Sequence, residues 1–151
     1  MWGSVEEKGI SVAELVGLHR YQLDEKGRIA LPAKFRAPFA DGVYLTLGVD
    51  GCLWGFPRDE WERRSQEVRA ELGEAGRHRE RVFFAFAETA SLRQGRLTIP
   101  GRLRELIGLS REVVVVGVSS RIEIWPAAAW ERYERDHMQT YLDGAVQADG
   151  A

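Results

Sequence analysis

This sequence has very little cysteine and no long apolar run, and each scarcity excludes a class of protein. Cys52 is the only cysteine among 151 residues, which excludes both an intrachain disulfide and a CxxC metal site. No apolar run approaches the roughly 20 residues of a membrane-spanning helix. The polar start of the chain does not resemble a secretory signal. We therefore expect a cytoplasmic protein without a membrane partner.

The sequence also lacks the common motifs of catalytic and cofactor sites. It contains no phosphate-binding glycine loop, no GxGxxG, no GxSxG and no HExxH. The three histidines, at positions 19, 78 and 137, do not have metal-ligand spacing. We therefore predict that the protein is not an enzyme and has no metal, no cofactor and no small-molecule substrate.

Charge is nearly balanced over the whole chain but is unevenly distributed along it. The net charge is −2 and the pI is about 6.0, which by itself argues against nucleic acid, because DNA affinity depends on neutralising phosphates. However, residues 20–36 carry five basic and two acidic side chains, and residues 93–104 carry four arginines and no acidic residue. Arginine suits contacts with phosphates and base edges. A genomic bias towards arginine would explain its excess over lysine but not this clustering.

The most informative feature that is present is an internal duplication. Residues 24–36 return as residues 92–104, and both segments read Gly-Arg, apolar, small or polar, apolar, Pro, then a basic–apolar–Arg triplet. The match continues further along, where residues 53–57 correspond to residues 122–126. A unit of roughly 45 residues is too short to bury a good core alone. We therefore expect two copies that pair about a pseudo-twofold axis and present any site twice.

Each copy is predicted to contain the same short elements, with a helix that starts at a proline because its missing N–H is tolerated there. In copy one we expect strands at 19–23, 29–31, 43–47 and 52–56 and a helix at 33–39. In copy two we expect strands at 89–92, 97–99, 113–116 and 121–125 and a helix at 100–107. Outside these elements we expect helices at 59–72, 77–87 and 126–141, with breaks at Gly73 and Gly76, a frayed tail from residue 143, and either a short helix at 11–16 or an extension.

Gly27 and Gly95 are predicted to end tight turns, since glycine adopts a positive φ at little cost. Arg28 and Arg96 follow these glycines directly. A single arginine on an exposed strand is usually only solvated, but the recurrence of the whole pattern favours a function for both.

The two copies differ four residues before the arginine. Asp24 could support the guanidinium of Arg28 or cap the turn, whereas copy two has Leu92 at this place. Trp61 and Trp130 recur at equivalent positions, and we interpret them as packing residues, with base stacking as the weaker alternative.

These residues resemble the MraZ family. The resemblance is carried by residues 23–36, by residues 50–54 with 59–62, and by residues 94–100 followed by 112–118. It covers about residues 17–133, although the residues before Gly17 depart from the family, whose members start nearer the motif.

The resemblance implies an α+β, mainly β fold of two tandem SpoVT–AbrB repeats that form an intramolecular swapped-hairpin β-barrel with flanking helices. On this basis we expect an N-terminal extension at 1–16, repeat one at 18–61, a helical linker at 62–86, repeat two at 87–130, and a C-terminal helix and tail at 131–151. The resemblance further implies a homo-oligomeric ring that binds repeated promoter boxes in double-stranded DNA. Such a protein would be a nucleoid-associated regulator, usually a repressor, of a bacterial cell-division and cell-wall gene cluster.

The family's recognition motif is Asp-x-x-x-Arg, which maps to Asp24 and Arg28, while in copy two only Arg96 matches. The basic residues after each proline match DNA-contacting positions of AbrB-type proteins. The predicted DNA-binding residues are thus Asp24, Lys26, Arg28, Lys34, Arg36, Arg93, Arg96, Arg102 and Arg104. Two alternatives stay open: a protein-interaction module that uses the helices around Trp61 and Trp130, and an enzyme.

Overall fold

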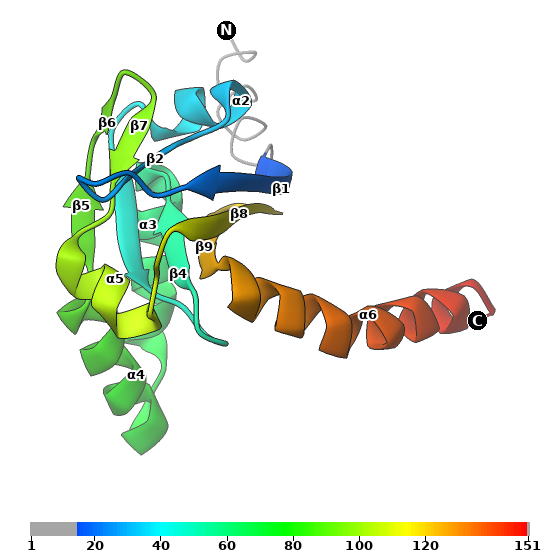
Figure 1. Ribbon diagram of the computed structural model, residues 1–151. Helices are drawn as coiled ribbons and strands as arrows, with labels where there is room; N and C mark the ends of the chain where they lie inside the picture. The colour runs from blue at the N-terminus through cyan, green and yellow to red at the C-terminus, as the bar shows by residue number, and fades with distance from the viewer. Residues whose placement is uncertain (1–14, 151) are drawn as a thin grey trace, which may run out of the picture.

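The computed structural model describes the backbone of residues 15–150 and the side chains of residues 15–144. Figure 1 shows the arrangement of its elements. The strands are β1 (Leu15–Gln22), β2 (Arg28–Ala30), β3 (Val43–Leu47), β4 (Leu53–Phe56), β5 (Glu88–Ala90), β6 (Leu92–Arg93), β7 (Arg96–Thr98), β8 (Glu112–Ser119) and β9 (Ile122–Pro126). The helices are α2 (Ala33–Arg36), the 3₁₀ helix η1 (Ala37–Phe39), α3 (Arg58–Ala70), α4 (Gly73–Ala85), α5 (Gly101–Ile107) and α6 (Ala127–Gly150).

The larger sheet interleaves strands from the two copies. Its order is β1-β8-β9-β4-β3-β5, and every neighbouring pair is antiparallel. The first strand of each copy pairs with the third strand of the other, since β1 pairs with β8 and β5 pairs with β3. The hairpins β8–β9 and β3–β4 meet at the centre, where β9 pairs with β4. This order reads as equivalent strands from either edge, as the predicted pseudo-twofold pairing requires.

The smaller sheet joins the two copies a second time. It has the order β2-β7-β6, so the short strand after the first glycine pairs with its counterpart after the second. Within the described residues the two sheets are separate and neither closes into a barrel. The mixed, sheet-rich α+β class is confirmed.

The main hydrophobic core is built from both copies. Residues at equivalent positions of the two copies both contribute to it. Phe35 and Leu103 from the two short helices are fully buried, and Ile29 of β2 and Leu97 of β7 are at most 1% exposed. In β8, three of the four consecutive valines predicted as a doubly buried strand are buried. Neither copy encloses this core alone, which is the reason why the chain needs both.

Helices cover the larger sheet, and the repeated tryptophans pack beneath them. Trp61 in α3 stacks on Phe83 of α4 with ring centroids 5.0 Å apart. Trp130 in α6 lies edge-on to Trp125 of β9 at 5.3 Å. The packing interpretation of both tryptophans is confirmed. Beyond this contact α6 projects away from the rest of the molecule (Figure 1), and none of the described helices is long and apolar enough to span a bilayer.

The largest differences from the predicted helix boundaries lie at the start of α4 and at the end of α6. We expected Gly73 and Gly76 to break the chain together, but α4 begins at Gly73 and contains Gly76. A β-carbon on Gly76 would collide with the backbone of Glu71, so this glycine lets α4 approach the end of α3. The predicted frayed tail was also wrong, because α6 continues to Gly150. An isolated glycine such as Gly144 weakens a helix by about 1 kcal/mol relative to alanine but does not end it.

Candidate nucleic-acid interface

The predicted arginines of the two glycine turns stand on one ribbon, formed by β2 and β7. Ile29 pairs directly with Leu97, and both side chains point into the core. Because side chains alternate along a strand, Arg28 and Arg96 both lie on the outer face. Arg28 pairs with Thr98, which places the two arginines diagonally, with Cα atoms about 7–8 Å apart by sheet geometry.

Asp24 organises the turn of copy one. Its Oδ1 accepts the backbone N–H groups of Lys26 and Arg28, both at 2.9 Å, and its Oδ2 accepts Nε of Arg28 at 2.8 Å. The backbone closes the turn, since the N–H of Gly27 donates to the carbonyl of Asp24 at 3.0 Å and Gly27 has φ of 76°. Both roles predicted for Asp24, the support of the guanidinium and the cap of the turn, are therefore present.

These hydrogen bonds also set the ionisation of Asp24. The pKa of its carboxyl group lies below the usual value, chiefly because the backbone N–H of Arg28 bonds to the charged form, with the Arg28 side chain as a further cause. Asp24 is thus a carboxylate at neutral pH, and the Arg28 guanidinium is held at a defined angle, with 32% of its side chain exposed.

The turn of copy two is a tighter hairpin. Arg93 pairs directly with Arg96, so only Gln94 and Gly95 connect β6 to β7, and both have positive φ, 55° and 75°. This is the backbone of a two-residue hairpin of the I′ kind. Leu92 replaces the aspartate and packs against the core, and the side chain of Arg96 makes no hydrogen bond or ion pair with any other residue in the described part of the chain.

Charge differs between the two turns. Copy one combines two acidic residues with Lys26 and Arg28 between positions 24 and 28, whereas copy two has two arginines and no acid between positions 92 and 96. Arg93 and Arg96 are exposed and face each other across the hairpin. Like charges directly opposite each other destabilise a strand pair, so a bound anion would stabilise this turn.

The basic residues after the prolines turn back onto the protein. Nζ of Lys34 lies 5.6 Å from the ring centroid of Phe35. The guanidinium of Arg102 lies 4.9 Å from the ring centroid of Phe86 and donates to the carbonyl of Ala85. These two side chains are exposed on the helices α2 and α5, away from the turns themselves.

Arg36 and Arg104 bond to the backbone of the strand ends. Nε and Nη2 of Arg36 donate to the carbonyl of Leu31 at 3.1 and 3.0 Å, and Nε of Arg104 donates to the carbonyl of Ile99 at 2.9 Å. Five of the nine predicted residues thus lie in the turns themselves and four on the short helices, from which Arg36 and Arg104 reach back to the glycine turns. A contact of any of the nine with DNA stays a prediction.

One residue near the site carried no signal in the sequence. His19 of β1 lies edge-on to Phe35 of α2, with ring centroids 5.4 Å apart, and its Nε2 is buried without a hydrogen-bond partner among the described residues. Burial lowers the pKa of this imidazole, and the nearby charge of Lys34 lowers it further. His19 is thus held neutral beneath the helix that follows the first turn.

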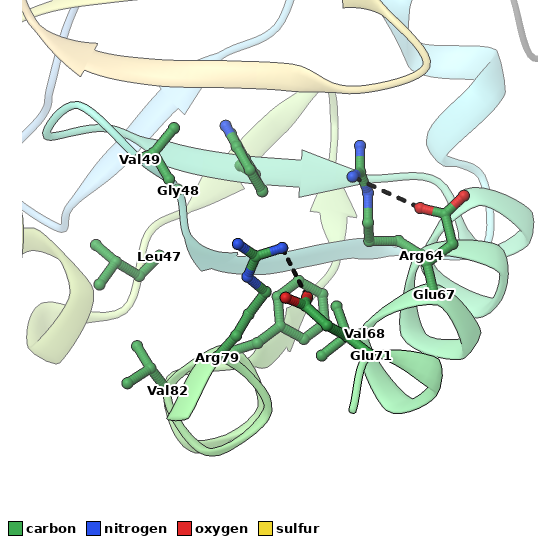
Figure 2. Close-up of a pocket in the computed structure, with 11 residues that line it drawn as sticks. Leu47, Gly48, Val49, Arg64, Glu67, Val68, Glu71, Arg79 and Val82 are labelled. Atoms are coloured by element: carbon green, nitrogen blue, oxygen red, sulfur yellow. Dashed lines mark ion pairs between the residues drawn. The ribbon is translucent and has the colours of Figure 1, made fainter. Parts of the chain in front are cut away.

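A separate pocket of about 400 Å³ lies between α3, α4 and the β3–β4 hairpin (Figure 2). Its charged residues pair with one another, since Arg79 lies 2.8 Å from Glu71 and Arg64 lies 3.6 Å from Glu67. Figure 2 shows these pairs beside apolar residues such as Val82. Because the arginines are neutralised, this pocket is less suited to a polyanion than the turns are.

The fold and the site define a class of protein: an internally duplicated, mostly β chain that presents two arginine turns on a ribbon shared by its copies. The family profile described as "MraZ protein, putative antitoxin-like" matches residues 15–81 and again residues 83–145. The chain belongs to the MraZ family, and the resemblance seen in the sequence is confirmed.

Curated relatives agree over nearly the whole chain. The protein is 44% identical to a protein of Salinispora arenicola over 131 residues, which covers 85% of this chain and 92% of the relative. It is 45% identical to a protein of Thermobifida fusca over 135 residues, covering 87% and 94%. It is 40% identical to a protein of Pelotomaculum thermopropionicum over 129 residues, covering 83% and 89%. Each of these relatives is named "Transcriptional regulator MraZ".

Proposed function

We propose that this chain is a sequence-specific, double-stranded DNA-binding transcriptional regulator and not an enzyme. The observation that carries the proposal is the β2–β7 ribbon, on which Arg28 and Arg96 stand on the same outer face. The curated relatives are named as transcriptional regulators, which agrees with this function. A cytoplasmic, nucleoid-associated location follows from the same proposal.

The dimensions of the ribbon suit the major groove of DNA. That groove admits a two-stranded β-ribbon and displays guanine O6 and N7, which arginine contacts with two parallel hydrogen bonds. A diagonal of about 7–8 Å between Arg28 and Arg96 spans about two base-pair steps. In this arrangement Arg28 and Arg96 read base edges, while Lys26 and Arg93 beside them contact phosphates.

Oligomerisation would reconcile the acidic net charge with DNA binding. Each chain offers one small basic ribbon, and a ring of several copies on repeated promoter boxes would add weak contacts through effective concentration. We extend the proposal to such a ring, to swapped-hairpin repeats at 18–61 and 87–130 that complete a barrel, and to repression of a cell-division and cell-wall gene cluster.

Fluorescence anisotropy tests the proposal on DNA from the promoter region of the protein's own gene, against a scrambled duplex, across a salt series. We expect tighter binding to the promoter and affinity that falls steeply with salt, since phosphate contacts release counterions. Equal affinity for both duplexes at every salt concentration would overturn the assignment.

A second candidate function is a protein-interaction module. The pocket beside α3 and α4 favours it, because apolar side chains that line the pocket, such as Val49 and Val82, are exposed. This function would not depend on the arginine turns. Copurification of a second protein at fixed stoichiometry, lost on Val82→Glu and retained on Arg28→Ala, would favour it over DNA binding.

A further inference from the structure

The glycine turn of each copy is covered by an arginine from the other copy. A β-carbon built on Gly27 would lie 2.8 Å from Cζ of Arg104. A β-carbon built on Gly95 would lie 2.5 Å from Cζ of Arg36. Both guanidinium groups thus lie directly against the glycine backbone, at a distance that only the absence of a side chain permits. The arrangement occurs twice, with the copies exchanged.

The backbone around each arginine is tied to the same turn. The N–H of Leu31 donates to the carbonyl of Gly95 at 3.0 Å, while the carbonyl of Leu31 accepts from Arg36. In the other half the N–H of Ile99 donates to the carbonyl of Gly27 at 2.8 Å, while the carbonyl of Ile99 accepts from Arg104. Each arginine is therefore held by the backbone of a residue whose own N–H holds the opposite turn.

We propose that Arg36 and Arg104 are positioning residues that act across the repeats. Arg36 of copy one fixes the turn that presents Arg96, and Arg104 of copy two fixes the turn that presents Arg28. The inference rests on the proposed DNA-binding function and assigns these two arginines a role beyond supplying charge. Arginine suits this role because its planar group can lie on a flat glycine surface while Nε donates along the plane.

A lysine substitution separates positioning from simple charge. Arg36→Lys keeps the positive charge but loses both the planar face and Nε. If Arg36 serves as a positioning residue, Arg36→Lys should lower affinity for the promoter duplex about 3- to 10-fold while affinity for the scrambled duplex and the salt slope stay unchanged. If Arg36 acts only as a phosphate contact, Arg36→Lys should bind the promoter like the parent, which would overturn the proposal.

A double-mutant cycle tests the crossed direction. On an Arg96→Ala background, Arg36→Lys should have little further effect, since the side chain that it positions is already missing. On an Arg28→Ala background its full effect should remain. Arg104→Lys should show the opposite pattern. Additive effects of Arg36→Lys with Arg96→Ala, or coupling to Arg28 of its own copy, would overturn the crossed assignment.

Amide hydrogen exchange by NMR tests the same contacts without DNA. Arg36→Lys should speed exchange of the amides at residues 94–96 and leave those at residues 26–28 unchanged, and Arg104→Lys should do the reverse. Arg77→Lys, on the exposed side of α4, is the matched control and should change neither turn. Exchange that rises equally at both turns would overturn positioning. Selective exchange together with no DNA preference would instead reject the proposed function and leave the positioning contacts established.

Discussion

The two arginine turns occupy equivalent places in the fold, yet they are held by different means. In copy one, Asp24 accepts hydrogen bonds from two backbone N–H groups and from Nε of Arg28. In copy two, Leu92 packs against the core, and positive φ angles at Gln94 and Gly95 close a two-residue hairpin. The first turn is fixed by a carboxylate, and the second by backbone geometry.

The two copies therefore share the place of this site in the fold but not its chemistry. The first turn holds its arginine at a fixed angle through an ion pair, which suits the geometric demands of base recognition. The second turn leaves its arginine unpaired by other described residues, opposite Arg93, so Arg96 is oriented less precisely for base recognition. We therefore expect copy one to contribute more to sequence preference than copy two.

The first prediction concerns the core that the two copies share, and it tests whether the difference between the copies is confined to their surface turns. Phe35 and Leu103 are equivalent, fully buried residues of the main core. Phe35→Ala should lower the free energy of unfolding by about 3–5 kcal/mol and Leu103→Ala by about 2–5 kcal/mol. Because both copies share the core, each variant should unfold in one cooperative transition in urea, followed by circular dichroism. Two transitions in either variant would mean that the copies fold independently.

The second prediction concerns the arginines themselves. Arg28→Ala should weaken promoter binding by about 1–3 kcal/mol, as expected for the loss of a bidentate contact to guanine. Arg96→Ala should cost less, since Leu92 cannot orient Arg96. Fluorescence anisotropy on promoter and scrambled duplexes measures the loss of affinity in each variant.

The control for these variants is circular dichroism, because both residues lie on the outer face and the fold should be unaffected. An equal or larger loss for Arg96→Ala would contradict the expected division between the copies. Binding unchanged by Arg28→Ala would remove Arg28 from the interface altogether.

The third prediction makes copy one resemble copy two. Asp24→Asn keeps an oxygen acceptor for the turn but removes the charge that pairs with Arg28. Promoter affinity should fall by less than in Arg28→Ala, because the guanidinium remains present. The pKa of Asp24 is lowered in the fold, so its stabilisation of the turn is present above the ordinary aspartate pKa and is lost as the pH falls through the lowered value.

An NMR titration of the turn amides measures this pH dependence. The amides of Lys26 and Arg28 should shift with an acidic midpoint in the parent and lose that transition in Asp24→Asn. The amides of residues 94–96 should not follow the same transition in either protein. A shared midpoint in both turns would show that Asp24 does not act locally.

Much of the fold could be predicted because the duplication sets it. The copies are short, so their pairing follows from the need to bury a core, and the strands beside the two glycines were found close to their observed places. The role of Asp24 was also accessible, since its spacing to Arg28 is local and the Asx turn is a known use of aspartate.

What could not be predicted depends on contacts between the copies. The contact of Arg36 with Gly95 joins residues 59 positions apart, and the sequence shows Arg36 only as a basic residue on a short helix. The sequence pattern predicts Gly76 as a helix breaker. Its actual role, the close approach to Glu71, arises only when α3 and α4 pack together, so the sequence alone does not show it. Local patterns predict local structure, and tertiary packing decides these cases.

The fourth prediction is a small pH dependence of stability that is confined to copy one. His19 lies beneath α2, with Lys34 and Tyr21 near its ring, and its pKa is lowered by burial and by the charge of Lys34. The equivalent place in copy two is Ala87, which cannot titrate.

Because the fold favours neutral His19, the stabilisation from His19 is present above the unfolded-state pKa of 6.5 and is lost as the pH falls through that pKa towards the lowered pKa of the folded state. Urea unfolding at about pH 7.5 and about pH 5.5 should therefore show a small loss of stability in the parent that is reduced in His19→Gln. An equal loss in the two proteins would mean that the pH dependence arises outside copy one. It would also show that the repeats do not differ in this respect.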